Sequence, residues 1–295
     1  MDADRNRAQG ILYIDRITHQ PKEVRARAVI LCAQALESVR ILFNSANAQF
    51  PAGLANSSGV LGHYLMDHIT GGGAGGRLEG LPGKPSANGP NRPDGIYVIR
   101  FRNTHNGPRA KTFLRGFGFQ GGGGVGFNWS APGFGDGFKK AMLEPVTFIG
   151  LGGFGECLAR WDNYVEINPN QVDVFGIPVL NVHMTYGDNE MAMVKDMAET
   201  AGEMLEAAGA KNVQTEVHPG GPGWAIHEVG IARMGDDPKK SVLNQFQQSH
   251  DVKNLFVVDG SSHVSASCQN PTWTIMALAW RSCDYLAEQL RKGEV

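Results

Sequence analysis

NLFVVDG, residues 254–260, is followed by NPTWTIMALA, residues 270–279, and these two stretches decide the fold of the C-terminal part of the chain. The apolar run that ends in Asp–Gly predicts a buried strand with a polar turn. Asn270 and Pro271 predict the N-cap and first turn of a long amphipathic helix, because proline's missing N–H would be unpaired there anyway. The expected inner face of this helix is Ile275, Leu278, Ala279, Ser282, Leu286 and Leu290.

The start of this helix also predicts a binding feature. The backbone N–H groups of Thr272 and Trp273 would lack intrahelical partners and carry the helix's positive partial charge. Such an end can hold an anion or an electron-rich carbonyl. Asn270 adds an amide that can donate to a substrate hydroxyl.

Upstream, HEVGIARMGDDP, residues 227–238, places a histidine just before a glycine-containing turn. Oxidation of an alcohol by hydride transfer needs a base for the hydroxyl proton, and histidine suits this role because its pKa of about 6.5 lies near working pH. His227 is therefore the candidate base. On the residues alone two alternatives remain open: an ordinary surface or core histidine, and an Asn–Pro pair that only caps a helix.

The rest of the chain divides into further blocks. In residues 1–68, Ile11–Asp15 reads as a strand, and the apolar run Ala26–Ala33 reads as a buried strand leading directly into a helix over Ala35–Ser45, which is a βα unit. Residues 69–224 are glycine-rich and strand-rich. Strands are expected there at Tyr97–Asn103, Thr112–Gln120 and Val179–Tyr186. A helix should follow, capped by Asp188 and ended by Gly209, with Val194, Met197, Ala201, Met204 and Ala208 on one face.

Composition excludes several function classes. The chain has 295 residues, 42% of them hydrophobic, and a formal net charge of −2 with no basic stripe, so nucleic acid is not an expected partner. No apolar run is long enough for a membrane segment, and residues 1–10 do not resemble a signal peptide. The four cysteines stand singly, so no metal site is predicted.

Two glycine clusters, residues 71–76 and 120–126, suit loops or close backbone packing. They and residues 150–155 match GxGxxG, but no convincing helix follows the last of these. Since a nucleotide-binding loop must open a helix, we expect no pyrophosphate site at these matches.

Taken together, residues 227–238 and 257–279 resemble the C-terminal signature of the glucose–methanol–choline (GMC) oxidoreductases, in their pyranose-oxidase-like and sugar-dehydrogenase branch. Stretches at residues 26–45, 53–68, 173–184 and 241–262 are similar to the family as well. The family usually has threonine where this chain has Ile231.

The resemblance implies an FAD-dependent oxidoreductase that acts on CH–OH groups of small alcohols or sugars, with an electron-accepting partner protein. His227 and Asn270 would be catalytic, and Asp259, Gly260, Pro271 and Thr272 would contact FAD. The implied fold is α/β: an incomplete Rossmann-like FAD-binding domain from residues 1–68 and 225–295, and an α+β, sheet-and-helix substrate domain from residues 69–224.

Members of this family open with a strand–GxGxxG–helix unit for the adenine dinucleotide, whereas this chain starts downstream of where that unit belongs. We therefore expect a fragment. Two alternatives stay open: a catalytically inactive half, or a non-catalytic interaction module. The sequence does not indicate a compartment.

Overall fold

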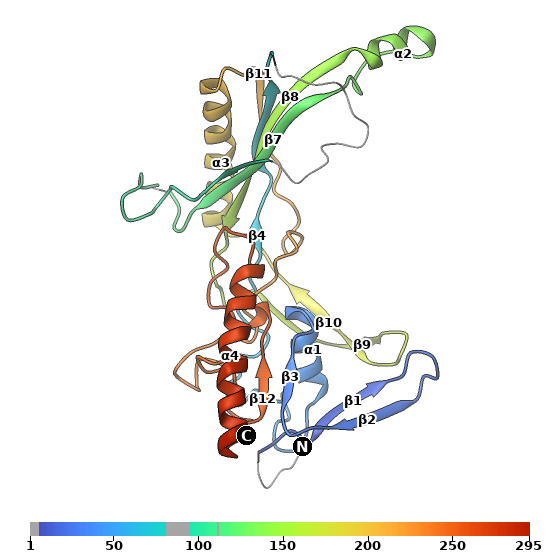
Figure 1. Cartoon of the computed structure of the whole chain (residues 1–295), viewed down its shortest axis with the longest axis vertical. Coiled ribbons are helices and arrows are strands. Elements are labelled where there is room, and N and C mark those ends of the chain that lie inside the picture. Colours follow the sequence, from blue (N-terminus) through green and yellow to red (C-terminus); the bar gives the residue numbers. More distant parts are fainter. Residues whose placement is uncertain (1–5, 81–94, 111) are drawn as a thin grey trace. The chain divides into compact units, whose positions relative to one another are not determined.

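The computed structural model describes residues 6–80, 95–110 and 112–295, and the chain divides into two compact units (Figure 1). Unit 1 consists of Met1–Asp67, Cys157–Thr185 and Pro222–Val295, and unit 2 of His68–Glu156 and Tyr186–Gly221. Residues 157–185 thus group with the N- and C-terminal stretches, whereas the sequence division placed them in the middle block. The assignment of these parts to cofactor and substrate remains a prediction.

Unit 1 contains a parallel strand pair, β3 (Val29–Leu31) and β12 (Leu255–Val257), in which Val29 pairs with Leu255. The predicted βα unit is confirmed, because β3 leads into helix α1 (Ala35–Asn44). The strand is shorter than expected and Ile30 on it is 42% exposed, so it is not buried on both faces. The remaining elements of unit 1 are β1 (Gly10–Ile14), β2 (Pro21–Arg25), β9 (Tyr164–Val172), β10 (Pro178–His183), the 3₁₀ turn η2 (Gly260–Ser262) and α4 (Thr272–Lys292).

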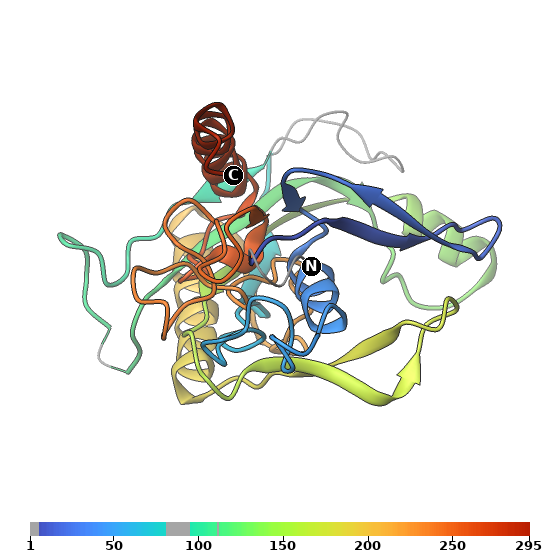
Figure 2. The same ribbon diagram turned by 90° about the horizontal axis from the view of Figure 1, so that it is seen from below.

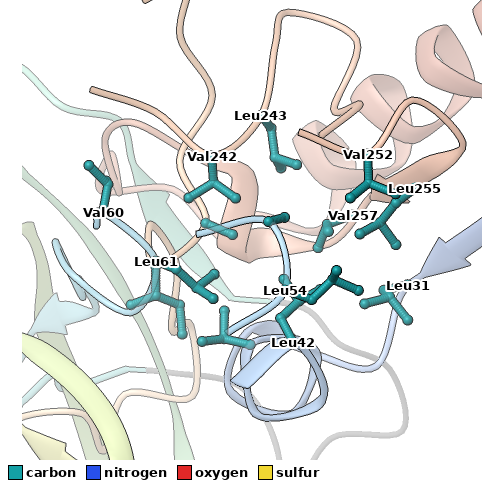
Figure 3. Close-up of a cluster of buried hydrophobic side chains, with 14 of the residues drawn as sticks. Leu31, Leu42, Leu54, Val60, Leu61, Val242, Leu243, Val252, Leu255 and Val257 are labelled. Carbon is teal, nitrogen blue, oxygen red and sulfur yellow. The ribbon is translucent and has the colours of Figure 1, made fainter. Parts of the chain in front are cut away.

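The core of unit 1 gathers apolar side chains from segments far apart in the sequence. Figure 3 shows Leu31 and Leu42, from β3 and α1, beside Leu255 and Val257 of β12. Loop residues also belong to the cluster, among them Leu54, Val60, Leu61, Val242, Leu243 and Val252. Burying a side chain of this size stabilises the fold by about 1.5–3 kcal/mol. The cluster therefore holds α1 against the C-terminal segment.

A polar link joins α1 to the β9–β10 hairpin, and Figure 2 shows the helix between this hairpin and the β1–β2 hairpin. Arg40 of α1 donates to the Asp173 carboxylate over 2.7 Å and to the backbone oxygens of Ile177 and Pro178. The Arg40 guanidinium holds the pKa of the Asp173 carboxyl below its usual range. The planar fork of arginine can satisfy these acceptors together, which a lysine could not do.

Unit 2 is an antiparallel six-stranded sheet with a helix packed on it. The strand order is β11-β5-β8-β7-β6, with β4 paired to β8. Its elements are β4 (His68–Ile69), β5 (Gly72–Arg77), β6 (Ile96–Val98), β7 (Phe117–Phe127), α2 (Gly135–Leu143), β8 (Pro145–Glu156), α3 (Asp188–Ala207) and β11 (Lys211–Val217). Helix α3 lies along β5, β8 and β11 (Figure 1) and buries Val194, Met197 and Ala201 as predicted, whereas Ala208 is exposed. The predicted α/β class with a sheet-and-helix domain is confirmed.

The glycine clusters are strands and not loops. Residues 71–76 lie mostly in β5 and residues 120–126 in β7. Glycine lets α3 approach the sheet: a methyl group on Gly155 would lie 2.5 Å from the sulfur of Met193. On the other face, Gly73 pairs with Gly152 and Gly75 with Gly150, so that part of the sheet carries no side chains.

Several predicted boundaries were wrong by a few residues. The strands expected from Tyr97 and Thr112 are shorter or begin later, at Ile96–Val98 and Phe117–Phe127. Helix α3 is capped by Gly187, whose N–H donates to the Glu190 carboxylate over 2.9 Å, and not by Asp188. Among the described residues, none of the helices combines the length and apolar composition that a membrane-spanning segment needs.

Candidate active site

The stretch that carries His227 is paired on one side with residues 62–66 of the same unit. Met66 and Val229 exchange two backbone hydrogen bonds of 2.9 Å, and the Gly62 N–H donates to the Ile231 oxygen over 2.7 Å. The Ile231 side chain, where a threonine was expected from the resemblance, is fully buried in the unit 1 core. An apolar side chain therefore suits this position, and His227 lies two residues before a fixed backbone bridge.

The same stretch is paired on its other side with η2. The N–H groups of Gly230 and Ala232 donate to the oxygens of Gly260 and Ser261 over 3.1 and 2.8 Å. A methyl group on Gly260 would lie 3.0 Å from the Glu228 oxygen, so only glycine allows this approach without movement. The two stretches singled out in the sequence, 227–238 and 257–279, are thus adjacent in unit 1.

Helix α4 brings its first turn to the same place. The Ile275 side chain lies 3.6 Å from where a Gly260 methyl group would be. The helix begins at Thr272 with Pro271 as its N-cap, so Asn270 lies one residue outside the cap position predicted for it. Pro271 is buried, whereas Asn270 and Thr272 are exposed. The six predicted inner-face residues of α4 are all buried or half-buried, which confirms that prediction.

Asp259 is 6% exposed and its carboxylate is already engaged by the protein. It accepts hydrogen bonds from the Ser38 hydroxyl of α1 over 2.5 Å and from the Ser261 N–H and hydroxyl over 3.0 and 2.6 Å. Asp259 therefore caps η2 and ties it to α1. Its predicted contact with a cofactor remains a prediction.

The structure adds a residue that sequence reasoning missed. Asp67 is completely buried and accepts hydrogen bonds from the backbone N–H groups of Ala225 and His227 over 2.7 and 3.1 Å. The only sequence signal was an acidic residue at the end of an apolar stretch, in the segment GHYLMDH (residues 62–68).

A cavity of about 280 Å³ lies beside the His227 stretch within unit 1. Its lining is mostly apolar: Leu36, Leu65, Val182, Met184, Pro222, Gly223 and Trp224, with Glu228 as the charged member. The Glu228 carboxylate accepts a 3.0 Å hydrogen bond from the Gln34 amide, which also caps α1 at the Leu36 N–H. The cavity therefore provides apolar contacts for a small carbon skeleton and a hydrogen-bond acceptor for one hydroxyl.

The GxGxxG matches lie in antiparallel strands and not in a βα turn. Residues 71–76 lie largely in β5, residues 121–126 in β7 and residues 150–155 in β8. None of them opens a helix. Within the described ranges these matches therefore provide no helix N-terminus for a pyrophosphate.

Comparison with known proteins identifies a family that this chain resembles. Residues 159–279 match the sequence model of the GMC oxidoreductase family, described as GMC oxidoreductase. The resemblance to this family that the sequence predicted is confirmed over these residues.

Several curated relatives cover almost the whole chain, and two of them are compared below. It is 34% identical to 2-methyl-1,2-propanediol dehydrogenase of Mycolicibacterium austroafricanum, over 96% of this chain and 52% of the relative. It is 27% identical to the gluconate 2-dehydrogenase flavoprotein of Pantoea cypripedii, over 99% and 49%. The chain thus spans about half the length of the curated relatives it matches.

Solved structures show the same fold at low sequence identity. Pyridoxine 4-oxidase from Mesorbium loti superimposes with a TM-score of 0.60 at 20% identity, over 96% of this chain and 55% of that one. Formate oxidase of Aspergillus oryzae RIB40, studied for its FAD modification, gives a TM-score of 0.66 at 13% identity, over 99% and 59%.

Proposed function

We propose that this chain takes part in the FAD-dependent oxidation of a CH–OH group in a small alcohol or sugar, with His227 as the base. The observation that carries the proposal is the meeting of three elements in unit 1: the His227 stretch, η2 at Gly260 and the first turn of α4. The match to the family model supports it, as do relatives named as dehydrogenases of a diol and of gluconate.

In this proposal His227 accepts the proton of the substrate hydroxyl, and the exposed Asn270 amide donates to the same oxygen. Fixing that oxygen between an acceptor and a donor aligns the carbon-bound hydrogen for transfer. When bound, FAD supplies the acceptor for the hydride. The electrons then pass to an external acceptor, for which we propose a partner protein.

The first turn of α4 fits the flavin end of FAD. Thr272 and Trp273 are exposed there, and backbone N–H groups at a helix start favour an electron-rich carbonyl edge. Pro271 would shape this contact, and Gly260 would lie with Asp259 nearer the ribityl or phosphate part. Asp259 would act near the ribityl or phosphate part, through its hold on η2. We assign residues 1–68 and 225–295 to the cofactor and residues 69–224 to the substrate, except that residues 157–185 pack with the cofactor unit.

The cavity beside the His227 stretch supports a small substrate. Its apolar lining suits a short carbon skeleton, and Glu228 would accept a hydrogen bond from a second hydroxyl. A short diol or a monosaccharide meets both conditions.

The test starts with the purified chain and added FAD. After removal of free cofactor, the flavin absorbance is recorded, and 2-methyl-1,2-propanediol, gluconate or other candidate alcohols are added without oxygen. We expect bleaching of the flavin bands, slower by at least about a thousandfold in His227→Ala. His105→Ala, an exposed histidine of unit 2, is the control and should bleach normally.

Two outcomes count against the proposal. A chain that stays colourless, soluble and monomeric favours the interaction module, since it takes up no cofactor. If the chain is yellow and the flavin bleaches at the same rate in His227→Ala, His227 is not the base.

A further inference from the structure

The turn that carries His227 is held by one buried carboxylate. Oδ2 of Asp67 accepts from the Ala225 N–H over 2.7 Å and Oδ1 accepts from the His227 N–H over 3.1 Å. The two bonds therefore reach the residues on either side of Ile226. Asp67 itself is 0% exposed, so these donors also compensate a charge that is cut off from water.

Ile226 is in a conformation that its side chain disfavours. Its φ is +59°, in the left-handed region, where a β-branched residue is a genuine outlier. The side chain is 80% exposed, so packing does not explain the conformation. The two bonds to Asp67 flank this residue and oppose its relaxation to a negative φ.

The position of Asp67 is itself fixed by the backbone. Met66, its neighbour, exchanges two hydrogen bonds with Val229, and the Leu65 N–H donates to the Asn163 oxygen over 2.9 Å. The carboxylate thus stands on a rigid segment, and the turn at Ala225–His227 is bent towards it.

We infer that Asp67 is the positioning residue of His227: its carboxylate keeps Ile226 in the left-handed conformation and so fixes the backbone from which the imidazole projects. Any effect of Asp67 on catalysis rests on the proposed function. Its stabilisation of the turn at Ala225–His227 does not. Asp67 acts through the backbone of the turn and is not assigned a contact with substrate.

The test compares Asp67→Asn with the unaltered chain by amide hydrogen exchange. An asparagine side chain has the same shape but one acceptor oxygen, so one of the two N–H groups loses its partner. Exchange in a peptide over residues 222–230 should rise about tenfold or more, as expected for the loss of one bond to a charged group. Peptides over α1 and β12 should exchange as before, and the urea midpoint should fall by no more than the loss of one buried hydrogen bond implies.

Substitutions at Ile226 provide a matched pair. Glycine adopts a positive φ without penalty, whereas alanine removes the side chain and keeps the penalty. In the Asp67→Asn background, Ile226→Gly should therefore return part of the protection in residues 222–230, because it relieves the strain on the turn without replacing the lost acceptor, and Ile226→Ala should not. If Asp67→Asn does not fold, Asp67→Glu is used in the same scheme, since its longer side chain displaces the carboxylate and keeps the charge.

A second readout follows His227 directly. In chain labelled with ¹⁵N-histidine, the imidazole signals of His227 should broaden or shift in Asp67→Asn, and those of His105 should stay in place. Unchanged exchange in residues 222–230 together with unchanged His227 signals overturns the inference. A loosened turn with an unaltered rate of flavin bleaching leaves the hold of Asp67 intact and contradicts the proposed function of His227 instead.

Discussion

Gly72 of β5 lies directly against the backbone of Val194 in α3: a methyl group on Gly72 would come within 2.4 Å of the Val194 carbonyl oxygen. A backbone oxygen in a helix cannot move aside as the end of a side chain can. We therefore expect Gly72→Ala to push α3 off the sheet and to lower the free energy of unfolding by about 1–3 kcal/mol. Urea denaturation followed by circular dichroism measures this change.

The control lies in the same strand. A methyl group on Gly75 would have its nearest neighbour 3.9 Å away, at the Ile149 oxygen, because Gly75 faces the side of the sheet away from α3. Gly75→Ala should leave stability within about 0.5 kcal/mol of the unaltered chain. Equal losses at both positions would contradict the account of α3 packing.

Asp259 should matter for folding even when no cofactor is added. Asp259→Asn replaces one acceptor oxygen by an NH₂ group facing the donors Ser38 and Ser261, so at least one buried hydrogen bond is lost. We expect the free energy of unfolding to fall by about 1–3 kcal/mol in cofactor-free protein. Asp284→Asn, on the exposed side of α4, should be neutral. If the free energy of unfolding falls only when FAD is present, Asp259 stabilises the bound cofactor and not η2.

His263 should make the stability of the chain depend on pH. Burial lowers the pKa of its imidazole below the ordinary value of 6.5, and the Asp259 carboxylate opposes this shift. Below pH 6.5 the unfolded chain therefore binds a proton that the folded chain does not, so this stabilising contribution is present above pH 6.5 and is lost as the pH falls below it.

The measurement is the urea midpoint at pH 7.5 and pH 5.5. The unaltered chain should lose more stability between these values than His263→Phe, in which the titrating group is absent. An identical pH dependence of the two proteins would show that His263 is not protonated preferentially in the unfolded state.

Glu228 should select for a second hydroxyl if the cavity beside the His227 stretch binds substrate. Glu228→Gln keeps the shape of the side chain and weakens its acceptor, so KM for a diol should rise about tenfold while KM for a monohydric alcohol stays unchanged. Steady-state assays of both substrates measure this difference. If KM rises equally for the two substrates, Glu228 does not contact the second hydroxyl.

The inner face of α4 could be predicted from the sequence because it depends on a local pattern. Ile275, Ser282 and Leu286 recur at helical spacing, and the pattern needs no knowledge of the partner surface. The glycine-rich strands could not be predicted in this way. Glycine disfavours strands locally, and only the close approach of α3, seen at Gly72, explains its use there.

The candidate site was predicted in part for a similar reason. His227 and Asn270 belong to dense motifs and were found from them, and the pairing of Gly230 with Gly260 confirms that the two motifs are adjacent. Asp67 was missed because it contacts the backbone of a distant turn. A backbone hydrogen bond leaves no complementary residue type in the sequence to reveal it.

The parallel pairing of Val29 with Leu255 has a consequence for synthesis of the chain. Strand β3 and helix α1 leave the ribosome before unit 2, whereas their partner β12 is made only after all of unit 2. During translation unit 2 can close on itself while the apolar face of α1, at Val39 and Leu42, waits uncovered. A ribosome stalled just before residue 254 should therefore carry a protease-resistant unit 2 and a protease-sensitive N-terminal segment that recruits chaperones.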